Sequence, residues 1–301
     1  MKHKFFFNPI FAVLLTVNSF AQNKTVVFQT DFGLKDGAVS AMKGVAMGVS
    51  SDLKLFDLTH EIPAYNIWEA AYRLEQTVPY WPAGTVFVSV VDPGVGTSRK
   101  SVVLKTKTGH YIVTPDNGTL TLIAESLGID SIREINEEIN RRKASEQSYT
   151  FHGRDVYAYT AARLAAGIIS FEQVGKLLPN EVVKIAYQKA DMQGPVIKGN
   201  IPILDVQYGN VWTNIPAELF WEFEAKFGDK ISVTIFHNKL KVYQITMPYC
   251  ATFGAVPPGK PLLYLNSLMQ VSFALNQASF SDVFKVKSGS EWSVELRKIK
   301  N

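Results

Sequence analysis

The chain has 301 residues, of which 47% are hydrophobic, so it is long enough for two domains with sizeable cores. Its formal net charge is only +4, and no cluster of Lys and Arg is interleaved with aromatic residues, which excludes a nucleic-acid-binding groove. The longest basic run, Arg141–Lys143, follows Glu137 and Glu138 and is interpreted as a solvated helix end or loop.

Residues 1–21 have the pattern of a secretory signal peptide. The basic start Met1–Lys4 precedes the largely apolar stretch Phe5–Val17, and Ser19-Phe20-Ala21 places small residues where a signal peptidase cleaves. The apolar stretch is short for a membrane span, and a retained membrane anchor stays the alternative. We therefore expect an exported protein, periplasmic or secreted, with no stable membrane association after cleavage.

Strand and helix patterns alternate between residues 24 and 190. The run Thr85–Val90 is apolar and rich in valine, as in a strand buried on both faces. This alternation predicts an N-terminal α/β domain over residues 24–190, with a largely parallel sheet and helices on both faces. The other expected elements are the strands Thr25–Gln29 and Leu53–Leu58, the helices Ala38–Val49, Asn66–Val78, Thr119–Leu127 and Val156–Ala166, and a hairpin of Ser101–Lys105 with Tyr111–Thr114.

A change of pattern marks the second domain, expected over residues 195–301. The segment Lys189–Pro195 is interpreted as a linker, and only Ala217–Lys226 is expected to be helical beyond it. Paired strand patterns predict a smaller, barrel-like C-terminal β domain. These pairs are Ile231–Phe236 with Lys241–Met247 and Pro261–Asn266 with Val271–Leu275.

Two carboxylates follow predicted strands of the first domain. Asp92 comes after Thr85–Val90, and the turn with Gly94 and Gly96 allows Arg99 to fold back toward it. Ligands of open α/β sheets bind beyond the carboxyl ends of the strands, although a plain surface turn is the alternative. Asp31, after the first strand, can accept two hydrogen bonds from the paired hydroxyls of a ribose.

His152 directly precedes the predicted helix Val156–Ala166. The partial positive charge at a helix N-terminus disfavours imidazolium, so a neutral imidazole able to accept or donate a proton is expected. A lone histidine is more often structural, but one beside a strand-end Asp and an Arg is a candidate for catalysis.

Five blocks together carry a resemblance to a known family. They are TDFGLKDG from Thr30, DPGVGTSR from Asp92, PDNGTL from Pro115, FHGRD from Phe151 and DVQYGNVWTNI from Asp205. In this order they resemble the S-adenosyl-L-methionine (SAM) hydroxide adenosyltransferase family, which is related to fluorinases and chlorinases. The resemblance implies a homotrimer that binds SAM between neighbouring subunits and cleaves it with water at the ribose 5′-carbon, giving adenosine and L-methionine.

The resemblance also implies roles for single residues. Asp92, Arg99 and His152 would handle the water, and the halogenase branch has Tyr-Ser where this chain has His152-Gly153. On its residues alone, the segment from Asp205 to Asn214 is equally consistent with an ordinary exposed strand and turn. By resemblance, the substrate-binding candidates are Asp31 for the ribose, Asp205 for the methionine ammonium, Tyr208 and Asn210 for the adenine, and Asn266 with Ser267 for the methionine carboxylate.

The chemistry expected from these residues needs no cofactor. A sulfonium leaves as a neutral thioether, so catalysis consists of positioning and activating water. The sequence has no HExxH motif and no His, Asp and Cys set with ligand spacing, so a metal-independent hydrolase is expected. The alternatives are a SAM-dependent halogenase of the same superfamily and a non-catalytic exported nucleoside-binding protein.

Overall fold

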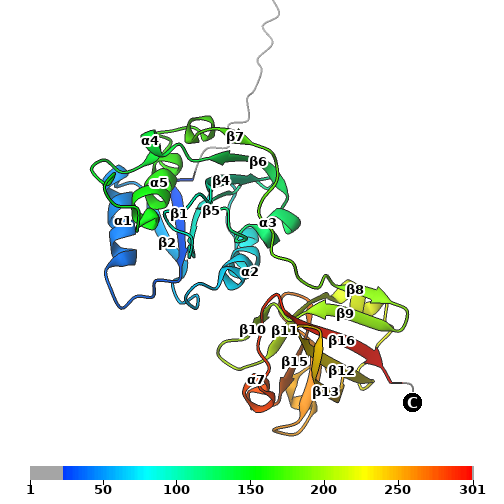
Figure 1. The fold of residues 1–301 in the computed structure, drawn as a ribbon. Helices are drawn as coiled ribbons and strands as arrows, with labels where there is room; N and C mark the ends of the chain where they lie inside the picture. Colours follow the sequence, from blue (N-terminus) through cyan, green and yellow to red (C-terminus); the bar gives the residue numbers. More distant parts are fainter. Residues whose placement is uncertain (1–22, 300–301) are drawn as a thin grey trace, which may run out of the picture.

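The computed structural model describes residues 23–299, and the predicted signal peptide lies outside them. Figure 1 shows an α/β lobe that ends with β7 (Leu177–Leu178) and a β-rich lobe that begins with β8 (Asp191–Gln193). This confirms the predicted fold class of an N-terminal α/β domain with a smaller β domain. Over the described residues, no helix is both long and apolar enough to cross a membrane.

The N-terminal lobe is built on a seven-stranded sheet of β1 (Thr25–Thr30), β2 (Lys54–Thr59), β3 (Val86–Val90), β4 (Ser101–Thr106), β5 (Tyr111–Pro115), β6 (Ile129–Glu134) and β7. The strand order is β2-β1-β3-β5-β4-β6-β7. The first four strands in this order are parallel, whereas β4, β6 and β7 pair antiparallel. The predicted β4–β5 hairpin is confirmed.

Both faces of this sheet are covered. α1 (Ala38–Val49) and α5 (Tyr159–Ala165) pack with the face that carries Val26 and Phe28, whereas α2 (Ile67–Thr77) and α3 (Thr121–Ser126) pack with the face that carries Val27 and Phe87. Successive residues of a strand point to opposite faces, so burial of both faces explains why the strand sequences are continuously apolar.

The helix expected from Val156 begins earlier than predicted. Gly153–Ala158 form a π-helical turn (η2) that leads directly into α5, and His152 is its N-cap residue. Such turns are rare and occur frequently at functional sites. The remaining short helices of this lobe are η1 (Val78–Tyr80), α4 (Glu137–Asn140) and η3 (Phe171–Val174).

The C-terminal lobe has two antiparallel sheets that share one core of buried aliphatic and aromatic side chains. One sheet has the order β10-β11-β15-β14, with β10 (Ile203–Leu204), β11 (Val211–Pro216), β15 (Gln270–Leu275) and β14 (Pro261–Leu265). The other has the order β13-β12-β16-β9-β8, with β13 (Leu240–Pro248), β12 (Lys230–His237), β16 (Trp292–Lys298) and β9 (Val196–Asn200). A bridge between Tyr249 and Leu263 links the two sheets at one edge.

Three expectations for this region are wrong in detail. The segment interpreted as a linker forms β8, which pairs with β9 across a turn in which Gly194 has a φ of +58°. The helix expected to reach Lys226 is α6 (Ala217–Trp221), and Glu224 adopts a left-handed φ of +51° beyond it. Two further short helices are present, η4 (Phe253–Ala255) and α7 (Phe280–Phe284).

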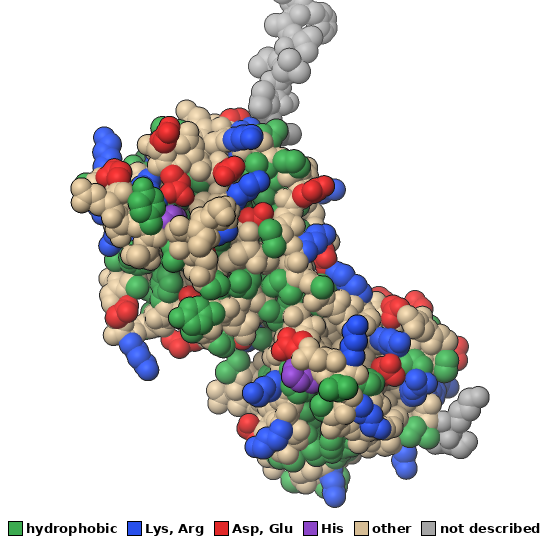
Figure 2. Space-filling view, viewed as in Figure 1, with side chains coloured by type: hydrophobic (Ala, Val, Ile, Leu, Met, Phe, Trp, Pro, Cys, Tyr) green, Lys and Arg blue, Asp and Glu red, His purple; other side chains and the backbone are tan. Residues whose placement is uncertain are grey.

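The two lobes are in direct contact. Trp68 of α2 donates from Nε1 to the carbonyl of Pro202 at 3.0 Å, and its ring lies 4.9 Å from that of Tyr187. A small apolar cluster joins Trp68 with Ile203 of β10. On the face shown in Figure 2, basic side chains are interspersed with acidic and apolar ones over both lobes.

Candidate functional site

An ion pair lies at the carboxyl end of β3. Arg99 Nε lies 3.0 and 3.1 Å from the two carboxylate oxygens of Asp92, and Arg99 Nη2 lies 2.5 Å from Asp92 Oδ2. The side chains are 6% (Asp92) and 11% (Arg99) exposed. Gly96 has a φ of +76° and lies in the turn that brings Arg99 back toward Asp92, as predicted from the sequence. Such a two-point contact fixes the orientation of the carboxylate.

Further contacts hold both members of the Asp92–Arg99 pair. Arg99 Nη1 donates to Ser101 Oγ at 2.9 Å, and the Tyr157 hydroxyl lies 3.4 Å from Asp92 Oδ2. Burial raises the pKa of Tyr157, so its hydroxyl stays protonated and able to donate. Each nitrogen of the Arg99 guanidinium thus has a partner within the protein. Of this pair, Asp92 and not Arg99 lines the cavity described next.

A cavity of about 250 Å³ brings together three of the predicted residues, Asp31, Asp92 and His152. Asp31 follows β1 and accepts from the backbone N–H of Tyr65 at 2.9 Å through Oδ2. Asp36 accepts from the N–H of Ala38 at the start of α1, so Asp31 is not needed to cap this helix. The other lining residues include Phe32, Val90, Val95, Thr150, Phe151 and Gly153.

The imidazole of His152 is buried at the edge of this cavity. Burial is the largest influence on its pKa and lowers it; Glu137 and Asp92 raise the pKa, whereas Arg99 and Arg141 lower it. The net direction agrees with the neutral imidazole that the sequence predicts. Its main cause is burial rather than the helix terminus.

The link between His152 and the Asp92–Arg99 pair was missed by sequence reasoning. Glu137 Oε1 lies 3.4 Å from Ser101 Oγ, and Glu137 Oε2 lies 3.6 Å from His152 Nε2. The interpretation of Arg141–Lys143 as a solvated segment is wrong for Arg141, whose side chain is 6% exposed and pairs with Glu137. The spacing of four residues between Glu137 and Arg141 was the available indication of this pair.

The C-terminal candidates line a second cavity, of about 450 Å³. Asp205, Tyr208, Asn210, Asn266 and Ser267 all border it. Asn210 Nδ2 donates to Asp205 Oδ2 at 3.2 Å, and the backbone N–H of Gln207 donates to Asp205 Oδ1 at 3.3 Å. Gly209 has a φ of +68° and lies against Ser279, so the loop from Asp205 to Asn210 requires a residue without a side chain here.

Asn266 has a structural as well as a candidate binding role. Its Oδ1 accepts from the N–H groups of Leu268 and Gln270 at 2.9 and 3.1 Å, and so shapes the β14–β15 turn. Its Nδ2 is buried without a hydrogen-bond partner among residues 23–299. That unused donor suits an anionic group, such as the methionine carboxylate that the resemblance implies for Asn266.

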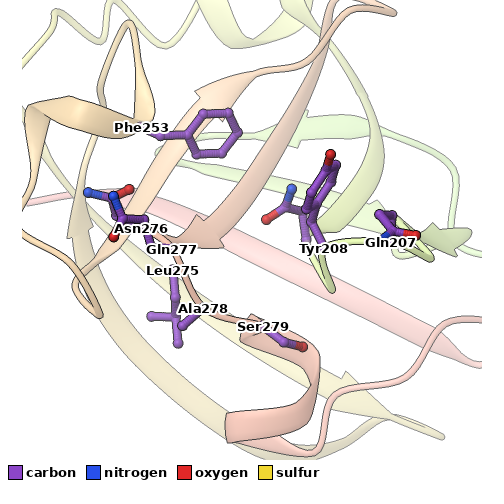
Figure 3. A pocket seen from close by; sticks show the side chains of 9 residues that line it. Gln207, Tyr208, Phe253, Leu275, Asn276, Gln277, Ala278 and Ser279 are labelled. Atoms are coloured by element: carbon purple, nitrogen blue, oxygen red, sulfur yellow. The ribbon is translucent and has the colours of Figure 1, made fainter.

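A third cavity, of about 590 Å³, adjoins the second through Tyr208, Asn210 and Phe253. Figure 3 shows Tyr208 and Phe253 on two sides of it. Two aromatic faces with an amide beside them suit a planar heterocycle. Sequence reasoning missed Phe253 and the run Leu275–Ser279, which complete this lining.

The candidate residues therefore form two sets in one chain. The 250 Å³ cavity is lined by the N-terminal lobe, whereas the 450 and 590 Å³ cavities are lined by the C-terminal lobe. Within residues 23–299, no group of three or more His, Cys, Asp and Glu residues is placed to hold a metal ion. The expectation of metal-independent chemistry stays a prediction.

Comparison with known proteins identifies the family. Models described as the SAM hydroxide adenosyltransferase N-terminal and C-terminal domains match residues 26–175 and 199–293. An (R)-S-adenosyl-L-methionine hydrolase from Methanocaldococcus jannaschii is 40% identical over 217 residues, covering 71% of this chain and 74% of the relative. One from Salinispora tropica is 32% identical over 270 residues, covering 89% and 97%.

More distant and structural relatives agree with this match. A fluorinase from Actinopolyspora mzabensis is 27% identical over 290 residues, covering 88% of this chain and 94% of the relative. The crystal structure of an uncharacterized conserved protein from Thermotoga maritima superposes with a TM-score of 0.82 at 35% identity, covering 90% of this chain and 99% of that one. This chain belongs to the SAM hydroxide adenosyltransferase family.

Proposed function

We propose that this protein is a SAM hydrolase in which water or hydroxide attacks the ribose 5′-carbon, giving adenosine and L-methionine. The observation that carries the proposal is the meeting of Asp92, held by Arg99, with Asp31 and His152 at one cavity. The hydrolase names of its relatives at up to 40% identity support the same reaction. Where the halogenase branch has Tyr-Ser, this chain has His152-Gly153.

Each residue of this cavity has its own role in the reaction. Asp31 accepts the ribose hydroxyls, which places the 5′-carbon near Asp92. The Asp92 carboxylate, oriented by Arg99, accepts a hydrogen bond from the attacking water and aligns it with the carbon–sulfur bond. That bond breaks as the carbon–oxygen bond forms, its electron pair stays on sulfur, and methionine leaves as a neutral thioether. The neutral His152 takes up the proton released by the water.

Positioning supplies most of the expected acceleration. A well-oriented nucleophile is worth up to roughly 7–11 kcal/mol of the barrier. The C-terminal cavities would hold the rest of the substrate, with adenine between Tyr208 and Phe253 and with Asp205, Asn266 and Ser267 on the amino-acid end. The protein is expected to need no cofactor, which is tested by activity after dialysis against a chelator.

We further propose that a complete site forms between neighbouring subunits of a cyclic homotrimer. Two observations support this: the ribose and water residues belong to one lobe, and the adenine and methionine residues line separate cavities on the other. A closed ring joins the N-terminal lobe of each subunit to the C-terminal lobe of the next. Export by the predicted signal peptide remains part of the proposal, and N-terminal sequencing of the exported protein would find Gln22 first.

The test uses isotopic water and both sulfonium epimers of SAM. Incubation in water enriched in oxygen-18, followed by chromatography and mass spectrometry, should give methionine and adenosine labelled at the 5′-hydroxyl. The (R) epimer should be cleaved faster, since the relatives' names specify it. Unlabelled adenosine would mean that the attacking oxygen does not come directly from water, and release of a 5′-thioadenosine derivative would place the attack at another carbon. Formation of 5′-chloro-5′-deoxyadenosine with chloride would favour a halogenase, and binding without turnover a nucleoside-binding protein.

A further inference from the structure

An ion pair between a buried arginine, Arg141, and a partly exposed glutamate, Glu137, lies beside the imidazole of His152. Glu137 is in the first turn of α4, and Arg141 follows the last residue of this helix. Arg141 Nη2 donates to Glu137 Oε2 at 2.5 Å. The Arg141 guanidinium also lies over the Tyr149 ring, 4.8 Å from its centroid, and Arg141 Nη1 lies 3.4 Å from the carbonyl of Ser148. The guanidinium is therefore fixed on three sides.

Arg141 and Glu137 both lie near Nε2 of the His152 ring. Arg141 Nη2 lies 3.3 Å from His152 Nε2, and Glu137 Oε2 lies 3.6 Å from the same atom. A guanidinium donates hydrogen bonds and accepts none, so the contact with Arg141 favours a lone pair on Nε2. In a neutral imidazole the proton is then on Nδ1, which is buried without a partner among residues 23–299.

We propose that Glu137 and Arg141 are positioning residues that set the tautomer and the protonation of His152. Arg141 keeps Nε2 unprotonated before the reaction, so that Nε2 is the nitrogen left to take up the proton from water. Glu137 holds Arg141 and connects it through Ser101 to the Asp92–Arg99 pair. Both residues act through His152. The effect on rate rests on the proposed function, whereas the tautomer and protonation of His152 are properties of the protein without substrate.

Four charged groups influence the His152 ring from two elements. Arg141 and Glu137 come from α4 and its end, whereas Arg99 and Asp92 come from the connection between β3 and β4. The Tyr149 and Tyr157 rings also lie near it, at centroid distances of 6.2 and 6.4 Å. Since Arg141 and Glu137 carry opposite charges, removing either charge should move the pKa of His152 in opposite directions.

The expected shifts have opposite signs. Arg141→Gln removes a cation and should raise the pKa of His152 by about one pH unit, whereas Glu137→Gln removes an anion and should lower it by about as much. The double variant should return close to the wild-type value. General damage to the site would not produce two opposite shifts that cancel.

The pKa and tautomer are measured by nitrogen-15 NMR of the full chain without substrate. The His152 signals are assigned by their loss in His152→Gln, and the wild type should show its proton on Nδ1. The acid limb of the pH profile of kcat/KM should then move with the NMR pKa in each variant. Glu138→Gln and Lys143→Gln remove exposed charges next to the pair, and they should leave the pKa unchanged.

Three results would overturn the inference: a wild-type proton on Nε2, shifts of the same sign in both variants, or no shift. If Arg141→Gln fails to fold, the wild-type tautomer and the downward pKa shift of His152 in Glu137→Gln still test the inference. Failure of the proposed function would give a different result. The wild type would then cleave no SAM, whereas the NMR titration of His152 could still be measured.

Discussion

Replacing Arg99 by alanine should lower both the stability of the protein and its turnover, and the two losses can be measured separately. The substitution removes every Arg99 contact to Asp92, whose side chain is only 6% exposed. It leaves the Asp92 carboxylate with the Tyr157 hydroxyl at 3.4 Å. Breaking a buried pair costs about 3–5 kcal/mol, and the lower end applies because Asp92 borders a cavity that admits water. A loss of about 3 kcal/mol lowers Tm by roughly 6–12 °C.

The same substitution should lower turnover by about 10² or more, because the carboxylate that we propose to align the water loses its fixed orientation. Thermal unfolding gives the first quantity. Adenosine formation, followed by chromatography well below both Tm values, gives the second. Substrate binding should stay largely intact, so the loss should fall on kcat rather than KM.

Arg297→Ala is a matched control, because Arg297 pairs with Glu295 at an exposed position, where its side chain is 54% exposed. Such a pair contributes about 0–1 kcal/mol, so Tm and rate should hardly change. An Arg99→Ala protein with wild-type rate would remove Arg99 from the reaction. One with a wild-type Tm would show that the Asp92 carboxylate gains little from its partner.

Three further outcomes are expected. Mixing Asp31→Ala and Asp205→Ala chains after dissociation and reassembly should restore about a quarter of the wild-type activity, since about one interface in four carries neither change; light scattering that finds a fully active monomer would refute this arrangement. Because burial lowers the pKa of His152 below 6.5, the acid limb of the wild-type rate should lie below pH 6.5, as imidazolium forms, and His152→Gln should lack that limb. Gly175→Ala should lower the free energy of unfolding by more than about 1 kcal/mol in a denaturant titration, because its Cβ would lie 2.1 Å from the carbonyl oxygen of Glu134. Gly194→Ala is its control, since a Cβ there meets nothing within 4 Å; an equal loss in both variants would mean that φ alone, and not the clash, sets the cost.

Local sequence patterns were sufficient to predict most of the elements. The apolar run before Asp92 became β3, the small-residue segment Ala38–Val49 became α1 over the same residues, and the β4–β5 hairpin formed across Gly109. Periodicity, valine content and glycine turns act over a few residues, so they are readable without the rest of the fold. The same holds for Asp31 and Asp92, which the strands before them carry to one sheet edge.

The predicted linker failed because its outcome depends on a partner far away in the sequence. Gly194-Pro195 is typical of a flexible connection, yet β8 and β9 use this turn to pair, and β9 is held in turn by β16. Backbone pairing with a strand almost a hundred residues later is absent from any local pattern.

The α/β scaffold, the strand-end acids and the block order that resembles the family can all be predicted from the chain without its fold. Which charges are buried cannot be predicted in this way. Glu137 and Arg141 look like a solvated helix end, yet Arg141 is enclosed beside Tyr149 and His152. Solvation of a charge depends on the elements packed against it, and these come from distant parts of the chain. The predicted domain bounds already placed Asp31 and Asp205 in different domains, but the cavities that the candidate residues line are visible only in the folded chain.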